Sequence, residues 1–241
     1  ISIGLSLLMA ASMSSFLGDA PPMTVVESNQ QAIMVVLFST VLTQLLAVII
    51  GAISVTGEYS TGMIRSSLTA APQRIPALLA KALVVGVSLF VSTIVVFAIA
   101  AFVTGPILPT GALDLSDPAS SIMPLLGASF YLAIVAIIGV GIGFVIRNGP
   151  GALAAGIGLV FVAPLIVTFF PRIPDLEWLH TLASYLPSSA GQSLFMGSPM
   201  SGNVLDTVPA IIPLVVWAVV AVLGGSAVLK RRDASSRSMT R

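Results

Sequence analysis

The chain has 241 residues, of which 56% are apolar and 8% charged, and its mean hydropathy is +1.08. Several uncharged runs of about 20 residues place it in the membrane class and exclude an ordinary soluble domain. It has no cysteine, which excludes disulfides and thiolate metal sites, and its net charge of +1 hides an asymmetry between the two sides of the membrane.

Hydropathy predicts an all-α polytopic membrane protein, with a single transmembrane domain over residues 1–241. The first apolar segment is short for a hydrocarbon core and has neither an initiating Met nor a basic flank. We interpret it as a span whose start is missing; a signal peptide is the alternative. The six expected spans are 1–17, 32–56, 77–103, 122–146, 150–170 and 210–229.

The basic residues fix the expected orientation. If the tail at 230–241 is cytoplasmic, both termini and nine of the ten Lys and Arg residues lie inside, and Arg172 alone lies outside. Of the nine acidic residues only Glu58 and Asp233 then lie inside. We therefore expect a multi-pass protein of the cell membrane with both termini cytoplasmic, in which Glu58 is an exception that needs explaining.

The outer connection 171–209 contains two expected short helices. The first has one apolar face and should stop at Pro187, whereas Ser189 and Gln192 are spaced as a capping box for the second. We expect both helices in or on the outer leaflet before span six, either as a lid over the spans or in contact with substrate. The apolar face consists of Leu179, Leu182, Ala183 and Leu186.

The expected spans contain no Asp, Glu, His or Arg, and Lys81 is close enough to a span end to snorkel. Transport coupled to protons or sodium normally needs such groups, so the energy should come from elsewhere. The chain has only two lysines, and neither ends a P-loop, so it is not itself a P-loop ATPase. With His180 as the sole histidine, we predict no catalytic, cofactor or metal site.

Two features inside the spans have alternative interpretations. Ser39, Thr43 and Gln44 form the most polar cluster of the second span, where they could contact substrate or make interhelical hydrogen bonds. Gly139 and Gly143 have the spacing of a small-residue packing edge rather than of a nucleotide-binding loop. Proline should also kink the fifth and sixth spans, at Pro164 and Pro213.

The cytoplasmic loop 57–76 gathers charge, small polar residues and proline between two apolar runs. Glu58 and Arg65 are seven residues apart, so on a helix they share a face two turns apart, with Gly62 between them. This spacing fits either a surface that meets one partner or a polar hairpin with basic anchors.

The stretch "GEYSTGMIRSSLTAAPQRIPALLAKAL" resembles the cytoplasmic loop of membrane subunits of type-2 ATP-binding-cassette (ABC) exporters. The six-span layout, "YLPSSAG" in the last outer loop and the basic tail extend the resemblance over nearly the whole chain. The chain departs from that pattern at its start, where the family usually has a cytoplasmic amphipathic helix. Residues that fit the loop pattern in order are Glu58, Gly62, Ile64, Arg65, Pro72, Arg74 and Lys81.

The resemblance implies that the loop forms a coupling helix between spans two and three, which docks on a separate nucleotide-binding ATPase subunit. That subunit would bind ATP and Mg, and the chain would pair with a second copy of itself in a homodimer, or with a homologous permease, surrounded by membrane lipid and without nucleic acid. The coupling residues would be Glu58, Tyr59, Gly62, Ile64 and Arg65.

The expected function is that of a permease subunit of an ATP-driven exporter. The uncharged spans favour an amphiphile, such as a drug, an antimicrobial peptide or a lipid, so roles in multidrug efflux or antibiotic resistance are expected. An exporter of a polysaccharide or another polar polymer is the first alternative, and an intramembrane enzyme is the second.

Overall fold

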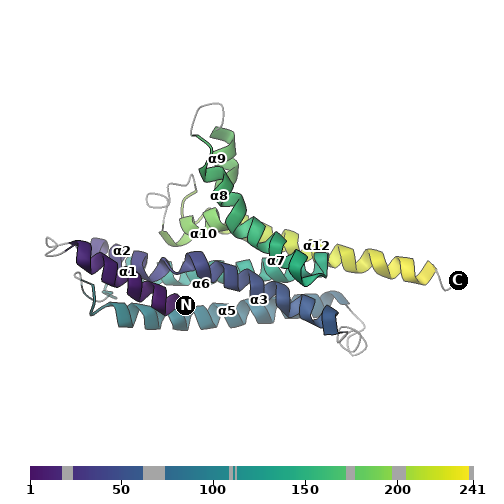
Figure 1. Ribbon diagram of the computed structural model, residues 1–241, viewed down its shortest axis with the longest axis horizontal. Helices are drawn as coiled ribbons and strands as arrows, with labels where there is room; N and C mark the ends of the chain where they lie inside the picture. Colours follow the sequence, from purple (N-terminus) through teal and green to yellow (C-terminus); the bar gives the residue numbers. More distant parts are fainter. Residues whose placement is uncertain are drawn as a thin grey trace.

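The computed structural model describes residues 1–17, 24–61, 74–108, 111, 113–171, 177–196 and 205–238, and its regular structure there is helical (Figure 1). Five helical segments in this part of the chain are long and apolar enough to cross a membrane, counting α7, η1 and α8 as one. The elements are α1 (Ser2–Leu17), α2 (Val25–Leu37), α3 (Thr40–Thr61), α5 (Arg74–Thr104), α6 (Pro118–Ile146), α7 (Gly149–Ile157), the π-helical η1 (Gly158–Val162), α8 (Ala163–Thr168), α9 (Glu177–Ser184), α10 (Pro187–Met196) and α12 (Ile211–Ser238).

Helix α6 is the centre of the bundle. It starts at a capped end, where the Asp117 carboxylate accepts a hydrogen bond from the backbone N–H of Ala119 at 3.2 Å. It ends at Arg147, whose left-handed backbone (φ 56°) donates its N–H to the carbonyl of Gly143. α6 packs against α2, α3, α5, α7, α10 and α12, and the large side chains of the core, including Tyr131 and Leu132, lie along it.

Glycine brings α3 and α6 together. A Cβ built on Gly139 would lie 2.4 Å from the backbone oxygen of Val48, and one on Gly143 would lie 3.0 Å from that of Ala52. On α3, a Cβ on Gly51 would lie 2.1 Å from the oxygen of Ala136. The predicted packing edge at Gly139 and Gly143 is therefore confirmed, and backbone approach of this kind is how membrane helices gain contact.

The second expected span, 32–56, is wrong as a single helix, because the chain breaks between α2 and α3 at Phe38–Ser39. The carbonyl of Val36 accepts hydrogen bonds from the hydroxyls of Ser39 (2.9 Å) and Ser6 (3.1 Å). A side chain that inserts into the helical ladder replaces a backbone donor and bends the helix. The hydrogen bonds from the serine hydroxyls to Val36 thus account for the interruption between α2 and α3.

Several other boundaries also differ from the sequence prediction. α6 starts at Pro118 instead of 122, because Asp117 caps it, and α12 continues to Ser238 instead of ending at 229. Pro213 lies in the first turn of α12, where its missing N–H has no intrahelical partner, so it breaks no hydrogen bond of the helix and the kink stays a prediction. The first expected span is α1, a 16-residue helix shorter than the five long segments.

The fifth expected span is irregular. Its middle turn, η1, is π-helical and immediately precedes Ala163 and Pro164. Figure 1 shows that α8 and α9 rise away from the other helices beyond this point. Wide turns of this kind and proline are common causes of bends in membrane helices.

Both segments expected to be helical in the outer connection are helices, α9 and α10. The predicted capping box at Ser189 and Gln192 is wrong, because α10 already begins at Pro187. Proline suits a first turn, since its fixed φ is helical and its absent N–H costs no hydrogen bond there. The indole N–H of Trp217 on α12 donates to the carbonyl of Tyr185 at 2.9 Å and holds this junction against the bundle.

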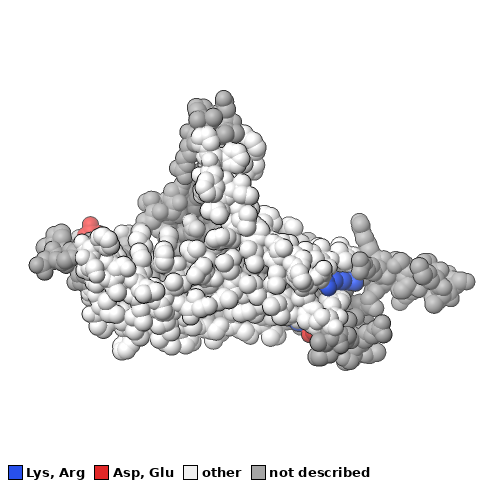
Figure 2. All heavy atoms as spheres, in the orientation of Figure 1, with Lys and Arg blue, Asp and Glu red and all other residues white. Residues whose placement is uncertain are grey.

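Charged atoms of the described residues lie near the two ends of the bundle on the face drawn in Figure 2, and the long surface between them is uncharged. Exposed apolar side chains cover the flanks of the long helices, such as Leu83 on α5 and Leu223 on α12. In water such a surface would be unstable, whereas in lipid it needs no covering. The chain is a multi-pass membrane protein.

Candidate functional site

The C-terminal end of α3 is joined to α5. The carboxylate of Glu58 forms a salt bridge with the ammonium of Lys81, and both side chains are partly buried. Glu58 lies in the last turn of α3, and Lys81 lies two turns into α5, so the ion pair joins the two helices on either side of residues 62–73. The acid that the positive-inside rule left unexplained thus has an intramolecular partner.

The next residue ties the same helix end to α6. The ring of Tyr59 meets Phe144 edge-on, with 6.5 Å between centroids and 83° between planes. The guanidinium carbon of Arg147 lies 5.1 Å from the centre of the Tyr59 ring, within the range of a cation–π interaction. The Nε of Arg147 also donates to the carbonyl of Phe144 at 3.4 Å, which fixes the guanidinium at the end of α6.

These contacts form a bracket, which we define as Glu58, Tyr59, Lys81, Phe144 and Arg147. It holds the C-terminal end of α3 against α5 and α6. The sequence drew attention to Glu58, Tyr59 and Lys81. It gave no reason to choose Phe144 or Arg147; the one signal was a lone basic residue at the cytoplasmic end of an apolar run.

The predicted coupling helix lies only partly within the described residues. Residues 57–61 continue α3 and do not begin a separate helix, and α5 already starts at Arg74. Gly62, Ile64 and Arg65 lie outside the described residues. Their proposed contact with an ATPase stays a prediction.

The three polar candidates of the second span are engaged in hydrogen bonds within the chain. The hydroxyls of Ser39 and Ser2 lie 2.6 Å apart and join the α2–α3 break to α1. Thr43 donates to the carbonyl of Ser39 at 2.9 Å. Gln44 accepts a hydrogen bond from the Tyr131 hydroxyl of α6, and both side chains are buried. The contacts of Ser39 and Gln44 match the interhelical alternative, whereas that of Thr43 lies within its own helical turn. The role of these residues in a substrate path stays a prediction.

These two groups of residues lie far apart. Ser39 precedes α3, whereas Glu58 lies nineteen residues further along the chain in the last turn of α3, which corresponds to about 28 Å at the helical rise per residue. In the part of the chain that the structure describes, no group of three His, Asp or Glu side chains is placed to hold a metal ion. The candidate site is therefore the group of contacts that joins α3 to α5 and α6 at one end of a long apolar bundle.

Comparison with known proteins identifies the family of the chain. A model of the ABC-2 family transporter proteins matches residues 5–234, which is nearly the whole chain. No match was found among the curated proteins. The bundle of long apolar helices and the match along its length lead to one conclusion: the chain belongs to the ABC-2 family of transporter proteins and is a permease subunit, whose transporter includes an ATPase partner.

Proposed function

We propose that this permease moves an amphiphile out of the cytoplasm or the inner leaflet as a homodimer driven by a separate ATPase subunit. ATP and Mg bind to that partner and not to this chain. The observation that carries the proposal is the family match over residues 5–234, because it defines a membrane path that depends on a second subunit for energy.

The bracket supports a mechanical role for the α3–α5 end. Glu58, Tyr59, Gly62, Ile64 and Arg65 form the surface that meets the ATPase, and the contacts of Glu58 and Tyr59 lead from that surface to α5 and α6. Binding of ATP to the partner shifts the permease between two access states by the difference in its docking free energy to each. α6 transmits the shift, since it contacts most of the other helices.

The apolar composition of the spans supports an amphiphilic substrate. A path lined by uncharged helices offers little to the hydroxyls of a sugar polymer, which aromatic and polar side chains normally bind. Aromatic residues make up only 7% of the chain. A drug, an antimicrobial peptide or a lipid fits better than a polysaccharide.

Inside-out membrane vesicles test both the energy source and the direction. Vesicles that contain the chain and its ATPase should accumulate a fluorescent amphiphile on addition of ATP and Mg, and a partner ATPase that cannot hydrolyse ATP should abolish the accumulation. Accumulation by right-side-out vesicles loaded with ATP, without accumulation by inside-out vesicles, would show import. ATP-dependent uptake of a polysaccharide without uptake of the amphiphile would replace the proposed substrate class.

A further inference from the structure

A groove of about 660 Å³ opens on the bundle at the end opposite the bracket. Its floor is one face of α6, where Asp117, Ser120, Pro124, Gly127 and Phe130 recur at helical spacing. From Asp117 to Phe130 the floor is about 20 Å long at the rise of an α-helix. This volume and length suit one extended alkyl chain with its headgroup.

The walls of the groove are held in place by hydrogen bonds that do not depend on a ligand. On the α2 side, the buried Asn29 donates to the carbonyl of Asp114 (2.8 Å) and to the hydroxyl of Ser120 (2.9 Å). Its amide oxygen accepts from the N–H of Asp114 at 2.8 Å. On the opposite side, α10 lies directly on α6, and a Cβ built on Gly127 would lie 3.2 Å from the backbone oxygen of Leu194. The groove is therefore a preformed feature of the fold.

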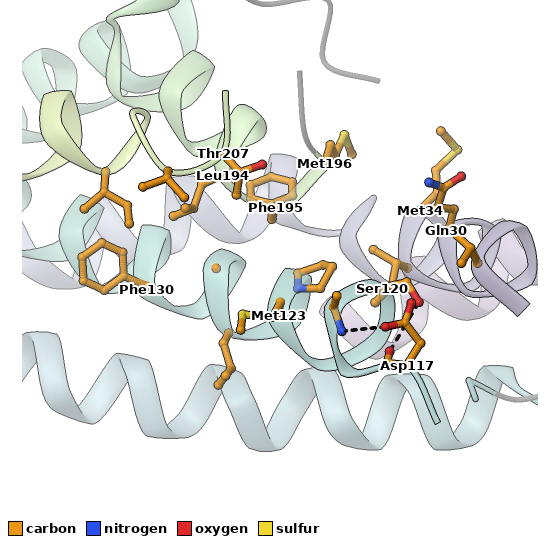
Figure 3. Close-up of a pocket in the computed structure, with 18 of the residues that line it drawn as sticks. Gln30, Met34, Asp117, Ser120, Met123, Phe130, Leu194, Phe195, Met196 and Thr207 are labelled. Atoms are coloured by element: carbon orange, nitrogen blue, oxygen red, sulfur yellow. Dashed lines mark hydrogen bonds between the residues drawn. The ribbon is translucent and has the colours of Figure 1, made fainter. Parts of the chain in front are cut away.

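Polarity changes along the length of the groove. Figure 3 shows Asp117, Ser120 and Gln30 together at one end and Phe130 at the other, with Leu194 and Phe195 along the wall. The polar end is at the start of α6, which the charge distribution places at the outer surface, and the apolar end points toward the middle of the membrane. A molecule with one polar head and one apolar tail matches this gradient.

The charge at the polar end is negative. Asp117 lines the groove, and Glu27 follows the lining residue Val26 in the sequence. Asp114 is held near this end by its backbone carbonyl and N–H, which are bonded to Asn29. The backbone N–H and hydroxyl of Thr24 lower the pKa of Glu27, and the backbone N–H and side chain of Ser116 lower that of Asp114, so both carboxylates are ionised at neutral pH. The described basic side chains, Lys81 and Arg147, lie at the other end of the bundle, and Arg172 is outside the described residues.

We propose that this groove binds a single-tailed cationic amphiphile, with its head at Asp117 and its tail along α6 toward Phe130. Charge complementarity selects the cationic head, and the apolar walls select the tail. As a place where substrate leaves the permease, the groove depends on the export function proposed above; as a binding site it does not.

A photoreactive dodecyl probe with a trimethylammonium head tests the site. The full chain with its ATPase, in lipid nanodiscs and without ATP, is irradiated with the probe, and the labelled peptides are identified by mass spectrometry. We expect labels in the peptides that contain Phe130 and Leu194, and we expect dodecyltrimethylammonium to compete better than dodecyl sulfate. Asp117→Asn should weaken binding by roughly three- to fivefold, the range of a partly exposed charge pair, while asparagine still caps the helix.

Leu126→Trp should block the groove from a position that is 40% exposed, and Leu83→Trp on the exposed face of α5 is the matched control. Equal competition by cationic, anionic and uncharged dodecyl compounds would overturn the cationic assignment. The groove would then bind an alkyl chain whatever the charge of its headgroup. Absence of groove labels, or cross-links showing a second copy of the chain in the groove, would overturn the site. Groove binding without ATP-driven export would count against the export function alone, and export without groove binding against the groove alone.

Discussion

At the residue scale, Glu58 has two roles to separate. It forms an ion pair with Lys81 inside the chain, and it belongs to the surface proposed to meet the ATPase. A variant that only neutralises Glu58 disturbs both. Exchange of the two charges separates them, because it restores the internal pair and reverses the charge offered to the partner.

We predict that Arg65→Ala and Glu58→Gln leave membrane insertion near normal but sharply reduce export and substrate-stimulated ATP hydrolysis. A lost charge-assisted hydrogen bond costs about 1.5–3 kcal/mol, enough to uncouple two states without unfolding the bundle. Lys230→Ala, which removes one basic anchor among several, should have little effect. Glu58→Lys combined with Lys81→Glu should insert normally and still fail to export; full transport by this double variant would mean that Glu58 acts only through Lys81.

The Gln44–Tyr131 pair is a second residue-scale case. Tyr131→Phe leaves the buried amide oxygen of Gln44 without a donor, which should cost about 1 kcal/mol, measured as a lower thermal unfolding temperature of the purified complex. Gln44→Leu should cost about as much, because it leaves the buried Tyr131 hydroxyl without an acceptor. If Gln44→Leu reduces export far more than Tyr131→Phe at similar stability, Gln44 contacts substrate and is more than an interhelical contact.

At the element scale, the α3–α6 interface depends on the absence of side chains. Gly51 and Gly139 let the two backbones approach until each helix contacts the carbonyl groups of the other. Helices in lipid have no hydrophobic driving force between them, so this close contact is a main source of stability. Because the bracket also joins α3 to α6, the same interface fixes the position of the C-terminal end of α3.

Adding one methyl group at this interface should separate the helices. Gly139→Ala places its Cβ 2.4 Å from the oxygen of Val48, so we expect a loss of about 1–3 kcal/mol or more and a reduced yield of folded complex in size-exclusion chromatography. Gly4→Ala in α1 is the matched control, since nothing lies within 4 Å of its new Cβ. Equal yields for the two variants would contradict the observed packing.

At the scale of the whole molecule, both proposals depend on orientation. The groove must open outward and the bracket must lie inside. The absence of cysteine from the chain makes both positions testable by single-cysteine labelling.

Thr181→Cys on α9 should react with a membrane-impermeant thiol reagent in intact cells, whereas Ser67→Cys should react only after permeabilisation. The reason is the positive-inside distribution, which places the basic loop 57–76 in the cytoplasm. Labelling of residue 67 and not residue 181 in intact cells, with both reactive after permeabilisation, would reverse the orientation.

The assembled transporter should contain two copies of this chain and two of a soluble subunit with a P-loop. Neither Lys81 nor Lys230 ends a P-loop, and the family match implies an ATPase partner for the permease. Native mass spectrometry of the detergent-solubilised particle measures the ratio directly. A particle made only of this chain that still transports after reconstitution would contradict the assembly.

The sequence by itself determined the membrane class and the polytopic helical fold, and it predicts the sidedness of charge. Each of these depends on composition and on runs of apolar residues, which are local properties. The sequence also predicted the packing edge at Gly139 and Gly143 and the two short helices α9 and α10. Spacing along one helix fixes which residues share a face.

Only the tertiary structure determined what each polar residue meets. The break at Phe38–Ser39 depends on hydroxyls that include Ser6 of another helix, and the partner of Glu58 lies across a loop on α5. Phe144 and Arg147 belong to the bracket because α6 ends beside Tyr59. The groove forms because Asn29 holds α2 against the start of α6. Such contacts join residues far apart in the chain, and their energies depend on distances and angles that a one-dimensional pattern does not contain.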